Sequence, residues 1–170
     1  MRDEIEHYRQ AIAEARPINI DQLRAGFRGR TYAELVSHHL RKQSPSERRL
    51  GITGTVLLIP DEMKVATEAF IDRWNERSRD RAFWQPDCAD VFDEIVADAR
   101  TTAQTAGVTA DDELAFNLFN LVTLNFADCA SDQPALREFA EIRAPGCLVT
   151  GSLALITALA ALVAYISNGI

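Results

Sequence analysis

Apolar side chains recur every three or four residues along most of the chain, which is the spacing of an α-helix that buries one face. Apart from residues 50–59, only residues 17–20 suggest an extended segment instead. We therefore predict an all-α fold, a compact bundle of five or six helices followed by a long apolar C-terminal helix. The pattern predicts a short helical turn in residues 21–30 and helices over residues 2–15, 31–43, 61–77, 87–106, 109–128 and 134–142.

Residues 50–59 fit two kinds of secondary structure. They carry no charge and are rich in β-branched side chains, which suits a buried strand, but the chain offers no second strand long enough to pair with them. The preceding Ser44-Pro45-Ser46-Glu47 has the form of a capping box with proline at the first helical position. We therefore expect a buried helix that begins after Ser44 and ends before Pro60.

The segment Leu114–Ala127 is apolar nearly all round, which is typical of the central helix of a bundle. Its few polar positions are Asn117, Asn120 and Asn125, and a buried amide needs a hydrogen-bond partner. Two arrangements meet this need. The amides either join neighbouring helices, or they line a polar pocket that binds a small ligand near the central helix.

The C-terminal residues 144–170 contain no Asp, Glu, Lys, Arg or His, and 19 of them, Leu148–Ile166, form an almost unbroken apolar run. As a helix this run is about 28 Å long at ~1.5 Å per residue, close to the ~30 Å hydrocarbon core of a bilayer. The chain thus divides into an acidic helical-bundle domain, residues 1–143, and an uncharged C-terminal helix, residues 144–170, which is a candidate single transmembrane anchor. The run is rich in alanine and only weakly hydrophobic, so the innermost helix of a soluble core is the alternative.

One face of this C-terminal helix is made of small residues, at steps of four, three, four and three along the chain. Small side chains let two helix backbones approach closely, so this packing face predicts a helical partner, either in lipid or within the domain. Within the domain, the helix that carries Phe116, Phe119 and Phe126 would fill it. The face consists of Thr150, Ala154, Thr157, Ala161 and Ala164.

The net charge of −7, from 18 basic and 25 acidic residues, argues against nucleic-acid binding, because phosphate contacts need a basic surface. The charge is uneven, however: residues 24–49 sum to +5 and residues 61–143 to −10. The basic block suits contact with anionic lipid or with an acidic partner, or it pairs with the chain's own acidic residues. Its members are Arg24, Arg28, Arg30, Arg41, Lys42, Arg48 and Arg49.

The sequence gives weak grounds for catalysis and none for a cofactor or a metal. Glu4 and His7 have the E-x-x-H spacing of di-iron bundles, but the second copy that such a site needs is missing. His38 and His39 are adjacent on one helix, so we expect one buried and one exposed ring. Cys88 follows a predicted helix start, where a thiolate is stabilised.

The three cysteines have no metal-binding spacing, and their odd number favours a reducing compartment.

These patterns predict a tail-anchored membrane protein whose helical domain stays in the cytoplasm, on the side of Arg137 and Arg143. It would act as an adaptor, assembly factor or accessory subunit through contacts with other helical proteins or membrane subunits, or with copies of itself. The alternative is a soluble all-α oligomer in which the C-terminal helix is core or interface, with a small ligand bound near the central helix.

Overall fold

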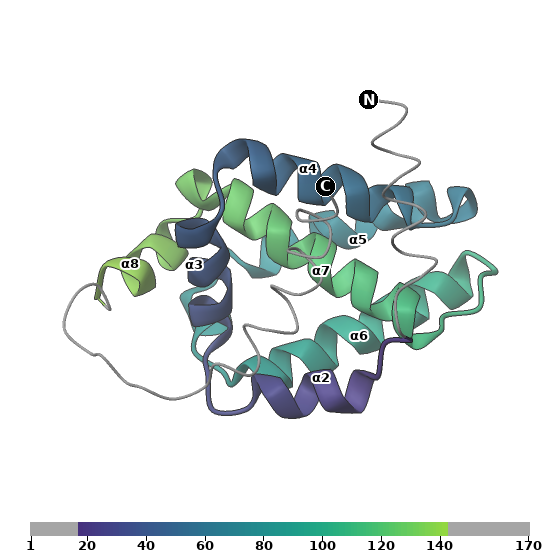
Figure 1. Cartoon of the computed structure of the whole chain (residues 1–170), viewed down its shortest axis with the longest axis horizontal. Coiled ribbons are helices and arrows are strands. Elements are labelled where there is room, and N and C mark those ends of the chain that lie inside the picture. The colour runs from purple at the N-terminus through teal and green to yellow at the C-terminus, as the bar shows by residue number, and fades with distance from the viewer. Residues whose placement is uncertain (1–16, 143–170) are drawn as a thin grey trace, which may run out of the picture. The chain divides into compact units, whose positions relative to one another are not determined.

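The structure is a computed structural model, and it describes residues 17–142. Within this range the chain forms seven α-helices and three short 3-10 helices, and no strand (Figure 1). The α-helices are α2 (Ile20–Phe27), α3 (Tyr32–Lys42), α4 (Pro45–Leu57), α5 (Lys64–Arg77), α6 (Cys88–Thr105), α7 (Asp112–Asp128) and α8 (Pro134–Ile142). The 3-10 helices are η1 (Asp61–Met63), η2 (Arg81–Trp84) and η3 (Ala130–Asp132). The helix expected over residues 2–15 and the C-terminal helix lie outside the described residues.

The all-helical class is confirmed for the described residues, but five or six helices is too low a count. The segment expected to form a single turn is instead an eight-residue helix, α2. Its first turn is stabilised by Asn19, whose side chain accepts a hydrogen bond from the Gln22 amide at 2.9 Å. Gly26 lies inside this helix without breaking it, and the chain turns only at Gly29, whose φ of 79° suits glycine.

Side-chain caps set where the helices begin. The capping box at Ser44 is confirmed, because the Ser44 hydroxyl accepts from the Glu47 amide and the Glu47 carboxylate accepts from the Ser44 amide. Thr31 and Glu34 form a second capping box at the start of α3. The predicted start of α7 at Thr109 is wrong, because Asp111 caps this helix by accepting from the Leu114 amide at 2.8 Å.

Asp87 joins two loops that are far apart in sequence. One of its carboxylate oxygens accepts from the Ala89 amide at 2.8 Å and so caps α6, and the other accepts from the Gly29 amide at 2.7 Å. The amide of Cys88 also donates to the Arg30 carbonyl at 2.5 Å. The turn between α2 and α3 is therefore fixed to the first turn of α6.

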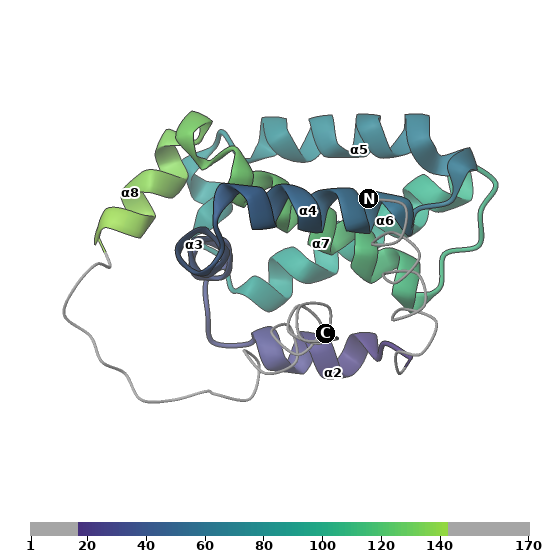
Figure 2. The same cartoon turned by 45° about the horizontal axis from the view of Figure 1, so that its top comes forward.

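The prediction that residues 114–127 form the central helix is confirmed. Helix α7 packs against α3, α4, α5 and α6; it runs between α4 and α6 in Figure 1, and Figure 2 shows α4 lying across it. Most of its side chains are buried, including Leu118, Phe119 and Phe126. Burial of this much apolar surface, at roughly 25 cal/mol per Å², is the main force that holds the described helices together.

Tyr32 occupies the centre of an aromatic cluster against α7. Its ring stacks on Trp84 with centroids 5.8 Å apart and meets the edges of Phe83 and Phe126. Its hydroxyl lies 2.8 Å from the Thr123 hydroxyl. Thr123 donates its own proton to the Phe119 carbonyl, so Tyr32 is the donor of this buried bond.

Residues 50–57 are helical as expected, and α4 ends at Leu57, before Pro60, but the prediction of a buried helix is wrong. Leu50 is 67% exposed, Val56 40% and Leu57 38%. Helix α4 contacts α7 with its opposite side, where Gly54 and Thr55 are buried. The segment lacks charge on both sides, so its periodicity did not reveal which side is covered.

We expect Tyr32→Phe to lower the free energy of unfolding by about 1 kcal/mol, because it removes one buried hydrogen bond without changing the packing of the ring. Urea denaturation of Tyr32→Phe, Thr123→Val and the double variant forms a double-mutant cycle. The double variant should lose little more than Thr123→Val alone. Fully additive losses would contradict a bond between the two hydroxyls.

Candidate functional site

Two of the three asparagines of α7 bind different helices. Asn120 donates to the Thr55 hydroxyl of α4 at 3.2 Å, whereas Asn125 donates to the side-chain oxygen of Asn75 in α5 at 2.9 Å. Asn117 is buried, at 7% exposure. The structure therefore does not bring Asn120 and Asn125 together, and both act as links between helices. A ligand at these amides stays a prediction.

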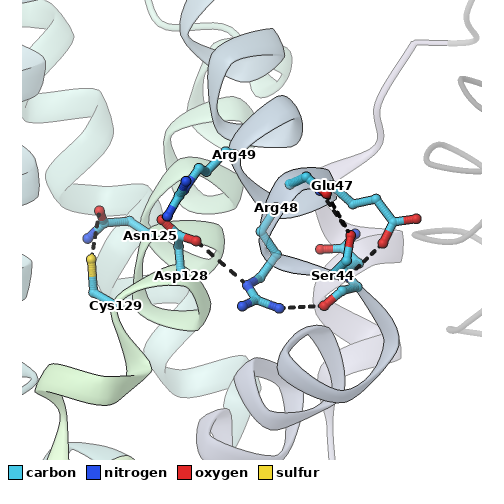
Figure 3. A network of polar contacts seen from close by, with 9 residues as sticks. Ser44, Glu47, Arg48, Arg49, Asn125, Asp128 and Cys129 are labelled. Carbon is cyan, nitrogen blue, oxygen red and sulfur yellow. Dashed lines mark hydrogen bonds and ion pairs between the residues drawn. The ribbon is translucent and has the colours of Figure 1, made fainter.

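A buried arginine anchors the first turn of α4 to the last turn of α7 (Figure 3). The side chain of Arg48 is 8% exposed, and its Nε lies 3.9 Å from a carboxylate oxygen of Asp128. Its Nη1 donates to the Gln43 carbonyl, while its Nε has no hydrogen-bond partner. Arg49 reaches the same carboxylate at 3.7 Å but is 74% exposed, so Arg48 carries the structural role.

The basic block predicted from the sequence divides into two groups. Arg24 binds Asp93 at 2.6 Å, and Arg48 and Arg49 lie near Asp128, so these three neutralise carboxylates of the domain itself. Arg28, Arg41 and Lys42 are exposed and have no ion-pair partner among residues 17–142. Arg30 is half-buried and also interacts with another group of the protein. Lipid contact by the block stays a prediction.

The outer face of α4 is the main exposed apolar surface among the described residues. We define it as Leu50, Thr53, Val56 and Leu57, which fall on adjacent stripes of the helix. The Thr53 hydroxyl donates to the Arg49 carbonyl at 2.9 Å, so the only polar side chain of this face already has its hydrogen bond. A helix face with exposed leucines and satisfied polar groups is typical of a binding surface.

Sequence reasoning missed this surface although the signal was present. Residues 50–59 carry no charge, and a helix that lies on the surface normally exposes at least one stripe of charged side chains to water. The absence of charge by itself predicts burial within the domain. It fits equally well a helix that the domain covers on one side and a partner covers on the other side.

The two histidines differ in burial, largely as expected. His39 is 6% exposed, and burial lowers its pKa to about 4. His38 is half-buried rather than exposed, and burial followed by the charges of Lys42 and Arg41 lowers its pKa. Both rings are therefore neutral at physiological pH.

The helix start does not activate Cys88. The residue does begin α6, but it is 1% exposed, and burial raises the pKa of its thiol to about 12. Desolvation of the thiolate outweighs the favourable helix dipole at this position. Burial also raises the pKa of Cys129, which contacts the Asn125 side chain. Neither thiol is activated as a nucleophile.

The remaining candidate residues of the sequence lie outside the described range. These are Glu4 and His7 near the amino end and the small-residue packing face, Thr150, Ala154, Thr157, Ala161 and Ala164. Within residues 17–142, no three acidic, histidine or cysteine side chains gather as metal ligands would. In the same range no helix has both the length and the hydrophobicity needed to cross a bilayer.

Comparisons of the chain with protein-family models, curated proteins and solved structures find no match.

We expect Arg48→Met to lower the free energy of unfolding by about 1–3 kcal/mol, because it leaves the Gln43 carbonyl and Asp128 with fewer partners in a desolvated position. Arg49→Met is the matched control, since it removes an exposed arginine from the same carboxylate, and it should change stability by less than about 0.5 kcal/mol. Urea denaturation measures both. Equal losses would contradict the structural role of Arg48.

The lowered pKa of His39 predicts a pH dependence of stability. The unfolded chain binds a proton at His39 below about pH 6.5, but the folded chain does so only near pH 4, so stability falls as the pH drops between these values. From pH 7 to pH 5 this residue should account for a loss of about 1–2 kcal/mol. Urea denaturation at both values should show a smaller loss for His39→Gln, and His38→Gln, at the less buried ring, should reduce it less.

Proposed function

We propose that this chain is a tail-anchored membrane protein whose acidic helical domain remains in the cytoplasm and acts through contacts with other proteins. Such a protein serves as an adaptor, an assembly factor or an accessory subunit. The observation that carries the proposal is the 19-residue apolar run Leu148–Ile166, in a stretch of 27 residues without Asp, Glu, Lys, Arg or His. Arg137 and Arg143 precede the run and favour retention of the domain on the cytoplasmic side.

Features of the domain support a role in protein contacts. The polar side chains of α7 are used to hold α4 and α5, and the buried Arg48 is used to hold the start of α4. The outer face of α4, in contrast, leaves Leu50 and Leu57 in water. Exposed leucines lower stability in water relative to a covered state, so their presence favours a surface that meets a partner.

The soluble alternative has one observation in its favour, the alanine-rich composition of the same run. Five alanines, two threonines, one glycine and one serine among 19 residues make membrane insertion only modestly favourable. In this alternative the chain is a soluble oligomer, and residues 148–166 complete its core or an interface. The two functions predict opposite behaviour on fractionation.

We expect the full-length chain to stay in the membrane fraction after an alkaline wash and to need detergent for release. Leu155→Lys combined with Leu159→Lys should move it to the soluble fraction, since each lysine costs roughly 3 kcal/mol in a bilayer. Leu155→Ile with Leu159→Ile is the matched control and should stay bound. Recovery of the unmodified chain in the soluble fraction without detergent would overturn the anchor.

A chain truncated after Arg143 tests the alternative directly. If the run is an anchor, the truncated chain should be soluble, folded and monodisperse by circular dichroism and gel filtration. If the truncated chain is unfolded or aggregated, residues 148–166 complete a soluble core.

A further inference from the structure

We propose that the outer face of α4 is the contact between two copies of this chain, which pair antiparallel about a two-fold axis close to Thr53. The inference rests on the proposed role in protein contacts and names the partner. It is carried by the apolar middle of the face together with the opposite charges at its two ends.

The apolar middle is nearly symmetric about Thr53. Leu50 precedes it by three residues and Leu57 follows it by four, and both side chains are exposed. In an antiparallel pair, Leu50 of one copy therefore meets Leu57 of the other, and this contact occurs twice. The small Thr53 lies where the helices cross, and its hydroxyl needs no partner there because it binds the Arg49 carbonyl.

The sequence around the amino end of α4 is net basic, and the sequence just after its carboxyl end is acidic. Arg49 lies 3.7 Å from Asp128 but is 74% exposed near the amino end of α4, where the exposed Arg41 and Lys42 outnumber the exposed Glu47. At the carboxyl end, Asp61 and Glu62 follow in η1. Asp61 binds Lys64 at 2.6 Å, whereas the exposed Glu62 has no ion-pair partner among the described residues.

This charge pattern selects one orientation and one kind of partner. Antiparallel copies bring the basic end of each α4 to the acidic end of the other, whereas parallel copies would place like charges together. An anionic lipid surface would attract Arg49 but repel Glu62. The uncharged segment 148–166 would leave both ends of the face without a counter-charge. A second copy of the chain covers the apolar middle of the face and also brings an opposite charge to each end of α4.

The contact is smaller than a typical permanent interface, because a 13-residue helix is only about 20 Å long at ~1.5 Å per residue. We therefore expect weak pairing between free copies in solution. Copies held in one membrane meet at a high effective concentration, and pairing becomes strong there. The proposed anchor and the proposed contact thus reinforce each other.

The test uses two full-length copies with different affinity tags, expressed together and extracted in a mild detergent, with recovery of the second tag as the readout. Unmodified copies should co-purify. Arg49→Glu in both copies, or Glu62→Arg in both, should reduce recovery about tenfold, because like charges then meet twice. Arg49→Glu in one copy with Glu62→Arg in the other restores both attractive pairs, so recovery should return to that of the unmodified chains.

Leu57→Lys in both copies should abolish co-purification, since it places a charge in the apolar middle. Arg79→Glu is the control for charge reversal elsewhere, because Arg79 is 72% exposed and contacts only Glu76 among the described residues, and it should have no effect. Circular dichroism checks that each variant is folded. All substituted positions in α4 and η1 are exposed, so the fold should be kept.

Three results would overturn the inference: unmodified copies that never co-purify, recovery that Leu57→Lys does not change, or failure of the mixed Arg49→Glu and Glu62→Arg pair to restore recovery. The first of these would mean that a different protein or segment covers the face. If fractionation shows the chain to be soluble, the same assay runs without detergent. Loss of the anchor and loss of the dimer therefore give separate results.

Discussion

The structure of this domain depends on covering α7 on every side. A helix of 17 residues that is apolar nearly all round cannot lie at a surface, so the other helices must form a shell around it. Helices α3, α4, α5 and α6 do so, and α2 and α8 pack on members of this shell. The burial of α7 thus dictates how many helices the domain needs and where they lie.

Polar contacts give this shell its specific arrangement. Hydrophobic burial alone is non-directional, and it would tolerate helices that slide along α7. Asn120, Asn125 and Asp128 each bind one neighbouring helix, so a shift of α4 or α5 by one turn would leave buried polar groups without partners. Asn120 and Asn125, two of the three amides of the predicted ligand pocket, therefore help to define the register of the bundle.

Much of this fold could be predicted from the sequence. The apolar segment Leu114–Ala127 predicted the central helix, and most of its side chains are buried. The capping box at Ser44 predicted the start of α4, because caps depend on residues adjacent in sequence.

What the sequence could not reveal depends on contacts between distant segments. The exposure of Leu50 and Leu57 follows from which side of α4 meets α7, and the uncharged residues 50–57 have no charged stripe to mark that side. The pKa of Cys88 follows from burial beneath other elements rather than from its place at a helix start. The outer face of α4 could not be predicted as a surface for a related reason. The absence of charged side chains indicates that a helix face is covered, but it does not show what covers that face.

The double role of Asp87 has a consequence for how this domain tolerates change in length. The carboxylate that starts α6 also holds the Gly29 amide, 58 residues earlier in the chain. An insertion between α2 and α3 would therefore disturb the beginning of a helix far along the sequence, although the loop itself is exposed. Length variation among homologues of this chain should accordingly avoid that loop and collect in the loop between α6 and α7, where Gly107 turns the chain with a φ of 75°.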